Sequence, residues 1–216
     1  MDLILFGMQG SGKGTLGKAL AKEFGMSMYE AGEAMRTLAK EDSPLGHKIK
    51  GILESGNLVE NEIVMETVKD FIDKADKNKA IIFDGIPRSV EQAQSLMALL
   101  DSMGREYRAF HLEIDEETAL RRLTTRKMCK ICNAIYPADY TKDTCEQKTE
   151  TGLCGGELYT RSDDVPEAIT KRIEIFKNST IPGMNLFKDK LIVMDGRPPI
   201  EPVRMEAIKL LSNILK

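Results

Sequence analysis

A short apolar run at residues 3–6 leads directly into a glycine-rich loop, and this junction limits the possible folds more than any other feature. The loop, residues 7–15, reads Gly-Met-Gln-Gly-Ser-Gly-Lys-Gly-Thr, and a helical pattern follows. Glycines let backbone N–H groups approach an anion closely, and the new helix turns its positive end towards the same point. The pattern G-x4-G-K-[S/T], here with Gly14 between Lys13 and Thr15, therefore predicts a phosphate-binding loop between a buried strand and a helix. Its expected contact residues are Gly10, Ser11, Gly12, Lys13, Gly14 and Thr15.

Strand-like and helix-like patterns alternate along the rest of the chain. Apolar runs occur at residues 3–6, 26–29, 80–83, 107–112 and 191–194. The first, third and fifth are nearly continuous, which is typical of parallel strands buried on both faces. Helical periodicity occurs at residues 13–24, 60–76, 90–103, 165–177 and 201–215. This alternation predicts an α/β fold with a five-stranded parallel sheet flanked by helices.

Two stretches interrupt the alternation and read as insertions. Residues 30–59 are helical and polar, and residues 127–159 hold every cysteine and no long helical period. The predicted core then consists of residues 1–29, 60–126 and 160–216.

Composition excludes some classes of protein. With 31 Lys+Arg against 34 Asp+Glu in 216 residues, the net charge of −3 argues against a sequence-independent nucleic-acid binder. The apolar runs are too short to span a bilayer. The N-terminus shows no basic segment followed by an apolar one, so we expect no signal peptide and a cytoplasmic protein.

The four cysteines, Cys129, Cys132, Cys145 and Cys154, predict a metal site. The first two have the spacing of a metal knuckle, and their clustering differs from the spread of a secreted disulfide scaffold. Four thiolates would leave zinc no open position, so the site would be structural. The alternatives are four reduced thiols, or one disulfide and two thiols.

Asp84 ends the third apolar run. A carboxylate at the carboxyl end of a buried parallel strand, next to the phosphate loop, is well placed to orient a hydrated Mg²⁺. The alternative is a cap for the turn that follows. His47 and His111 are expected to be a surface residue and a strand residue, not catalytic bases.

Further motifs give the chain a specific resemblance. The loop is similar to the G-x-x-G-x-G-K-G-T of adenylate kinases and related nucleoside monophosphate kinases, residues 84–88 match their D-G-x-P-R, and residues 32–36 resemble their G-[D/E]-x-x-R. The remaining arginine positions match in order at Arg122, Arg126, Arg161 and Arg172. The end of the cysteine segment, residues 154–159, resembles the zinc-bearing lid of many bacterial adenylate kinases. In that pattern the third ligand falls at position 151, which is Thr151 here, whereas Cys145 lies nine residues before Cys154.

The resemblance, which covers residue 3 to about residue 200, implies transfer of a phosphoryl group from MgATP to AMP, giving two ADP. It makes residues 30–59 an AMP-binding insertion and residues 127–159 a zinc-binding lid. It implies catalytic roles for Lys13, Arg88, Arg126, Arg161 and Arg172. It implies ATP contacts at Arg122, which would stack on adenine, and at Arg126, Ile135, Tyr136 and Pro198. It implies AMP contacts at Ala31, Arg36, Asn57, Leu58, Val59, Gly85, Arg88, Gln92, Arg161 and Arg172. It also implies a cis bond at Pro87 and a monomer without nucleic-acid or membrane partners.

Two positions leave the identity of the acceptor nucleotide undecided. Many adenylate kinases have threonine where this chain has Ala31, and alanine there resembles UMP/CMP kinases. Those kinases, however, usually carry asparagine in place of Gln92, which offers adenine both a donor and an acceptor. We therefore expect AMP, with a UMP/CMP-type or other monophosphate kinase as the alternative. A zinc-ribbon P-loop switch protein is a further alternative, although the sequence lacks the N-K-x-D motif of a GTPase.

Overall fold

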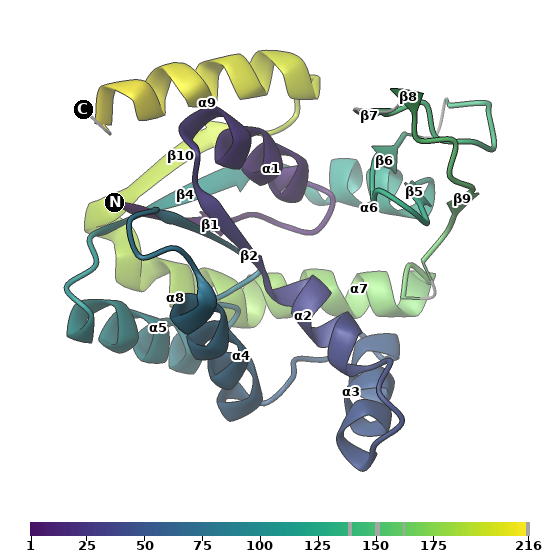
Figure 1. The fold of residues 1–216 in the computed structure, drawn as a ribbon. Helices are drawn as coiled ribbons and strands as arrows, with labels where there is room; N and C mark the ends of the chain where they lie inside the picture. Colours follow the sequence, from purple (N-terminus) through teal and green to yellow (C-terminus); the bar gives the residue numbers. More distant parts are fainter. Residues whose placement is uncertain (138–139, 150–151, 162, 215–216) are drawn as a thin grey trace.

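The computed structural model describes residues 1–137, 140–149, 152–161 and 163–214. Its centre is a sheet of five parallel strands, as the sequence predicts, and their order is β10-β4-β1-β3-β2 (Figure 1). The bounds are β1 (Asp2–Phe6), β2 (Ser27–Glu30), β3 (Ile81–Asp84), β4 (Tyr107–Glu113) and β10 (Leu191–Asp195).

The central strand β1 is buried on both faces. Leu3 and Leu5 belong to one apolar cluster, whereas Ile4 and Phe6 belong to another on the opposite face. The first cluster includes residues of α1 (Lys13–Phe24) and α9 (Ile200–Ile214), and the second includes residues of α4 (Asn61–Lys74) and α5 (Val90–Ser102). Figure 1 shows these two layers of helices on either side of the sheet.

One prediction of burial is wrong. The run at 191–194 was expected to be buried on both faces, but Val193 is 54% exposed. The reason is that β10 is an edge strand and pairs only with β4. Leu215, the last apolar residue of the expected C-terminal helix, lies outside the described residues.

Strand register brings the carboxyl ends of the strands together. Leu5 pairs with Asp84, and Phe6 pairs with His111, so β1 ends one residue beyond β3 and two residues before β4. The chain then leaves the sheet edge into the glycine loop. Ligands of open α/β sheets bind outside this edge, which positions the site.

The two interrupting stretches form their own small elements. Residues 30–59 contain α2 (Ala31–Leu38) and α3 (Pro44–Glu54), and Ser43 caps α3 by accepting a hydrogen bond from the N–H of Gly46. In the cysteine segment, a three-stranded sheet and a hairpin form from short strands. These are β5 (Lys127–Cys129), β6 (Ile135–Tyr136), β7 (Lys148–Thr149), β8 (Gly152–Leu153) and β9 (Leu158–Tyr159).

The structure contains two helical regions that the sequence patterns did not predict. One is α6 (Glu116–Thr124), capped by the side chain of Asp115. The other continues α7 (Pro166–Ile175) as a π-helical turn, η1 (Phe176–Thr180), followed by α8 (Ile181–Met184) and a 3₁₀ turn, η2 (Asn185–Lys190). Because Pro182 has no N–H and its ring would clash with the carbonyl four residues earlier, α7 cannot continue regularly into this point, and Pro182 instead lies in the first turn of α8.

Candidate active site

The loop after β1 forms a cradle at the start of α1. Gly10 and Gly12 adopt positive φ angles of 84° and 94°, which side chains rarely allow. A Cβ at Gly10 would also lie 3.1 Å from the carbonyl oxygen of Ala119. The helix begins at Lys13 and has no acidic residue in its first turn. Its positive end is therefore available to an anion.

Gly14, the additional glycine after the lysine, makes room for Asp84. A Cβ at Gly14 would lie 3.1 Å from Asp84 Oδ2. The other oxygen, Asp84 Oδ1, is buried and has no hydrogen-bond partner among the described residues. An unpaired carboxylate oxygen beside a phosphate loop fits a hydrated Mg²⁺, whose waters would donate to it.

Lys13 is partly buried in a strongly charged neighbourhood. Burial lowers the pKa of its ammonium group to about 8; Asp84 acts against this shift, whereas Arg88, Arg172 and Arg126 add to it. These charges come from three separate segments of the chain, at residues 84–88, 126 and 172. The fold therefore gathers the predicted arginines around the phosphate loop.

Arg88 lies in the loop after β3, and hydrogen bonds fix both its backbone N–H and its backbone carbonyl. The backbone N–H of Arg88 donates to Gln92 Oε1 at 2.8 Å, and the hydroxyl of Thr180 donates to the Arg88 carbonyl at 3.1 Å. Burial, with Arg172 next in effect, lowers the pKa of the Arg88 guanidinium to about 10. The Ile86–Pro87 bond is cis, and Gly85 has a φ of 80°.

Two adjacent carboxylates organise the other arginines. Asp164, whose side chain is fully buried, accepts a forked pair of hydrogen bonds from Arg126, from Nε at 2.9 Å and from Nη2 at 2.6 Å. It also accepts one from Arg172 Nη1 at 3.1 Å. Asp163 pairs with Arg161, whose Nε lies 2.7 Å from Asp163 Oδ1. The carboxylates thus hold the planar groups in fixed orientations.

The acceptor-side residues surround the start of α2. Arg36 on α2 donates to Glu33 Oε2 at 2.9 Å, and Ala31 is buried. A Cβ at Gly85 would lie 3.6 Å from that of Ala31, so α2 meets the Arg88 loop here. After α3, Val59 is buried, whereas the side chains of Asn57 and Leu58 are exposed or partly buried.

Arg122 on α6 connects the phosphate loop to the loop after β10. Its Nη1 lies 3.3 Å from the carbonyl oxygen of Gly10 and 3.0 Å from that of Gly196. Its Nη2 donates to the Arg197 carbonyl at 2.9 Å, next to the exposed Pro198. This places the two predicted adenine-contacting residues, Arg122 and Pro198, in one neighbourhood.

In the cysteine segment, Ile135 is 48% exposed, whereas Tyr136 faces the cysteines. The Tyr136 hydroxyl donates to Cys145 Sγ at 3.1 Å and accepts from the N–H of Glu146 at 2.8 Å. Its predicted contact with the ATP ribose stays a prediction.

The four cysteine sulfurs converge. All lie within 4.8 Å of one another, with Cys129–Cys154 at 3.6 Å and Cys132–Cys145 at 3.4 Å. Tetrahedral zinc with Zn–S bonds of about 2.3 Å would place its sulfurs about 3.8 Å apart. Burial raises the pKa of the Cys129 thiol, but the N–H groups of Cys132 and Ile131 outweigh this and lower it to about 7. The donors fit zinc, and Cys145 completes the set; Thr151 lies outside the described residues.

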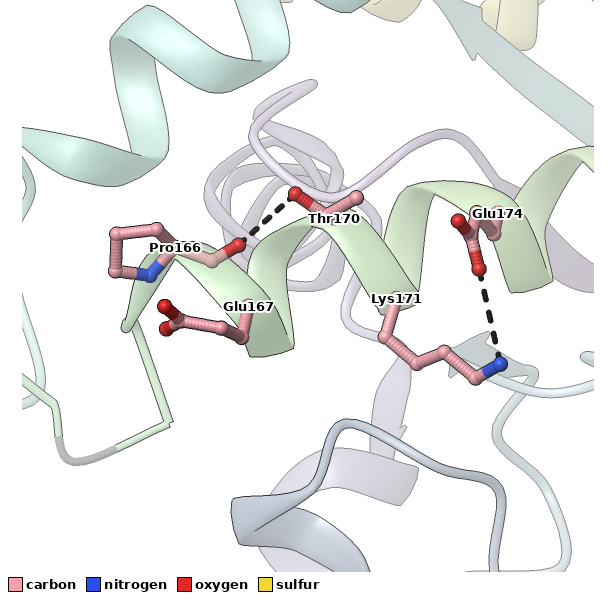
Figure 2. Close-up of a pocket in the computed structure, with 5 residues that line it drawn as sticks. All are labelled: Pro166, Glu167, Thr170, Lys171 and Glu174. Atoms are coloured by element: carbon pink, nitrogen blue, oxygen red, sulfur yellow. Dashed lines mark hydrogen bonds and ion pairs between the residues drawn. The ribbon is translucent and has the colours of Figure 1, made fainter.

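A large surface hollow lies elsewhere, over α7. Figure 2 shows its lining, in which Thr170 donates to the Pro166 carbonyl and Lys171 pairs with Glu174 at 3.6 Å. None of the predicted site residues lines it. A narrower pocket lies at the phosphate loop itself and includes Gly7, Lys13, Gly85 and Arg88 in its walls.

Comparison with known proteins agrees with this geometry. The adenylate kinase family model matches residues 5–192. The chain belongs to the adenylate kinase family. It is 36% identical over 215 residues to the adenylate kinase of Caldicellulosiruptor bescii, covering 98% of this chain and 99% of that protein. It is 33% identical over 223 residues to that of Bacillus subtilis, with both chains fully covered, and 34% identical over 206 residues to that of Methanosarcina acetivorans, covering 94% of each chain.

As a member of the adenylate kinases, the protein is a phosphotransferase that binds nucleotides, as its sequence predicts. His111 lies on β4 and His47 is exposed on α3, so neither is in the site. Among the described helices, none is long and apolar enough to cross a membrane.

Sequence reasoning missed Thr180, which contacts Arg88. Its only sequence signal is the helix-breaking Pro182 two residues later, which marks an irregular turn but not its contact.

Proposed function

We propose that this chain transfers the γ-phosphoryl group of MgATP to AMP, giving two ADP, with the residues described above. The observation that carries the proposal is the convergence of Lys13, Arg88 and Arg172 with Asp84 outside the carboxyl end of β1. Phosphoryl transfer needs positioning and charge stabilisation more than covalent chemistry. A pocket with more cations than carboxylates supplies both.

The residues would divide the work between the two nucleotides. The loop N–H groups and Lys13 would bind the ATP phosphates, and Arg36 and Arg88 would bind the AMP phosphate. Arg126, Arg161 and Arg172 would stabilise the group in transit. Asp84 would accept hydrogen bonds from the waters of Mg²⁺, which supplies charge neutralisation to the ATP phosphates when bound.

The carboxylates of Asp163 and Asp164 would keep the arginines oriented. Burial raises the pKa of Asp163, but the hydrogen bond from Arg161 and the nearby charges of Arg161, Arg172 and Arg36 outweigh it, so the pKa falls below its usual range. The carboxylate therefore stays ionised near neutral pH and holds Arg161 in place before any nucleotide binds.

In the same proposal, the four cysteines hold a structural zinc ion in the lid. The convergence of their sulfurs supports this. Closure of the lid and of residues 30–59 over the nucleotides would exclude water and limit hydrolysis of ATP. The four free thiols also suit a reducing compartment, so we place the enzyme in the cytoplasm, and we expect it to act as a monomer.

Preference for AMP would depend on Gln92. Its Oε1 already accepts from the Arg88 N–H, and a carbonyl oxygen has a second lone pair for the adenine amino group. The same side chain would thus bind the base and hold the arginine that binds the phosphate. A base that leaves the amide unpaired would cost about 1–3 kcal/mol, roughly tenfold to a hundredfold in selectivity.

The test is kcat/KM for AMP, UMP, CMP and GMP, with MgATP saturating and diphosphate formation measured. AMP should be preferred. Gln92→Ala should reduce that preference, and Ala31→Thr should increase it by adding a hydroxyl. If UMP or CMP is the better acceptor, the enzyme is a pyrimidine nucleotide kinase; if no monophosphate yields a diphosphate, the switch-protein alternative gains support.

A further inference from the structure

Gln9, in the phosphate loop, has a polar side chain that the function described so far does not use. It lies between Gly7 and Gly10. Its Oε1 atom is buried and accepts no hydrogen bond from the residues that the structure describes. Buried, unpaired amide oxygens are rare in folded proteins because the lost contact with water is not replaced. This oxygen therefore calls for an explanation.

The surroundings of Gln9 give one. It lines the same narrow pocket as Lys13 and Arg88, together with Thr180 of η1. Lys13 is assigned to the ATP phosphates and Arg88 to the AMP phosphate. Gln9 therefore shares a pocket with one residue from each side of the transfer.

The chemistry of a carboxamide suits this position. Phosphate oxygens accept hydrogen bonds, and the glutamine amide carries two N–H donors beside its oxygen. Rotation about the last side-chain bond exchanges the oxygen and the nitrogen, because that torsion is broad and roughly two-fold. The amide thus adds donors without adding charge to a pocket in which burial, and after it the like charges, already lower the pKa values of Lys13 and Arg88.

We propose that Gln9 is a further catalytic residue, whose side-chain N–H donates to the phosphoryl group as it passes between Lys13 and Arg88. During the step, the bond from the γ-phosphorus to the β–γ bridging oxygen of ATP breaks and a bond to an AMP phosphate oxygen forms. Gln9 gains and loses no proton. This inference rests on the proposed function and adds a donor to it.

The decisive variant is Gln9→Glu, which is nearly isosteric. The new carboxylate cannot donate and repels phosphate, so kcat/KM for AMP should fall by about a hundredfold or more. In the nucleotide-free protein, the same carboxylate faces Lys13 and Arg88 and should be attracted to them. The Tm should therefore stay unchanged or rise. Loss of activity with unchanged or increased stability distinguishes contact with the phosphate from a structural role.

Gln9→Ala removes the donor without adding repulsion, and its kcat should fall roughly tenfold. The matched control is Gln94→Glu, the same change at an exposed position of α5, which should alter neither activity nor Tm.

Turnover of Gln9→Glu within about threefold of wild type would overturn the inference. If that variant instead lost stability, Gln9→Ala decides: a kcat within twofold of wild type at an unchanged Tm would also overturn it. Failure of the wild-type protein to phosphorylate AMP would contradict the proposed function instead, so the two failures are distinguishable.

Discussion

The phosphate pocket and the cysteine lid are held together in different ways. In the pocket, charged side chains are fixed by other side chains, as Asp164 fixes Arg126 and Arg172 before any nucleotide is present. In the lid, four sulfurs converge with only weak hydrogen bonds between them. The geometry of the pocket therefore belongs to the fold, whereas that of the lid would, with the proposed zinc, depend on an ion.

The two regions also differ in how charge is balanced. Burial lowers the pKa values of Lys13 and Arg88, and the neighbouring arginines add to this effect, so the charged forms of both groups would be stabilised by nearby negative charge. Nucleotide phosphates would supply it. In the lid, thiolates would collect negative charge that zinc neutralises. The first region should thus respond to ligand and pH, and the second to chelation.

The largest effect should come from Lys13→Ala. This change removes the loop cation that follows the migrating charge, so kcat should fall by about a hundredfold or more, at least roughly 3 kcal/mol of transition-state stabilisation. Steady-state rates and the Tm of the same preparation test this. Near-wild-type turnover in a folded variant would contradict the assignment of the phosphate loop.

Loss of the lid metal should affect stability more than chemistry. Cys154→Ser, or a chelator added to wild type, should lower the Tm by about 5–10 °C, which corresponds to roughly 2–3 kcal/mol for a chain of this size. Some phosphoryl transfer should survive at low temperature because no catalytic group is lost. Elemental analysis should find one zinc per chain in wild type.

The variant Cys145→Ser tests the third ligand separately, and it should lose the metal as Cys154→Ser does. Full retention of zinc would show that this cysteine is not a ligand. A metal-free wild type, prepared reduced and without chelator, would contradict the site altogether.

The pH dependence of kcat/KM should also distinguish the pocket from the lid, because Lys13 lies in the pocket. Because the pKa of Lys13 is about 8, kcat/KM for MgATP should fall above this pH, approaching tenfold per unit, as the ammonium is lost. Lys13→Arg, whose group stays charged, should remove this limb whatever its residual rate. An unchanged limb in that variant would assign it to another group.

The lowered pKa of Lys13 also makes stability depend on pH, in the opposite direction to kcat/KM: stability rises with pH. Between about pH 8 and the ordinary value of 10.5, the folded chain binds fewer protons at this lysine than the unfolded chain. Its contribution to stability is therefore present at high pH and is lost as the pH falls through the folded value.

The smallest effect should be that of Tyr136→Phe. The change removes the hydroxyl that donates to Cys145 Sγ, so zinc should pass to a competing chelator about tenfold more readily, with little change in Tm. The control is Tyr140→Phe, whose hydroxyl donates to the Thr144 carbonyl instead of to sulfur. Equal zinc loss in both variants would show that the contact with sulfur does not matter.

Contiguous patterns explain why much of the core could be predicted. The strand runs and the helix at 13–24 are local signals of burial and periodicity, and their bounds agree with the structure to within about two residues. The phosphate loop is likewise one unbroken segment. These features depend on residues close together in the chain.

What could not be predicted depends on contacts between distant segments. Asp2, in the first strand, is buried and accepts from Arg105 Nε at 2.6 Å and from the Ile81 N–H at 2.8 Å. No spacing rule indicates this pairing. The partial exposure of β10 follows from its place at the sheet edge, which a run of apolar residues does not encode.

The central position of β1 also sets the order in which a growing chain can become an enzyme. Its two neighbours are β3 and β4, so the strand made first waits for residues 81–113 to leave the ribosome before both of its edges are covered. The lid pairs mainly within itself, whereas Arg161 and Arg172 emerge after it. Synthesis thus completes the nucleotide-binding loop early and two of the arginines that would act on it late. A nascent chain halted before residue 160 would carry the cradle with Lys13, Arg88 and Arg126, but neither Arg161 nor Arg172.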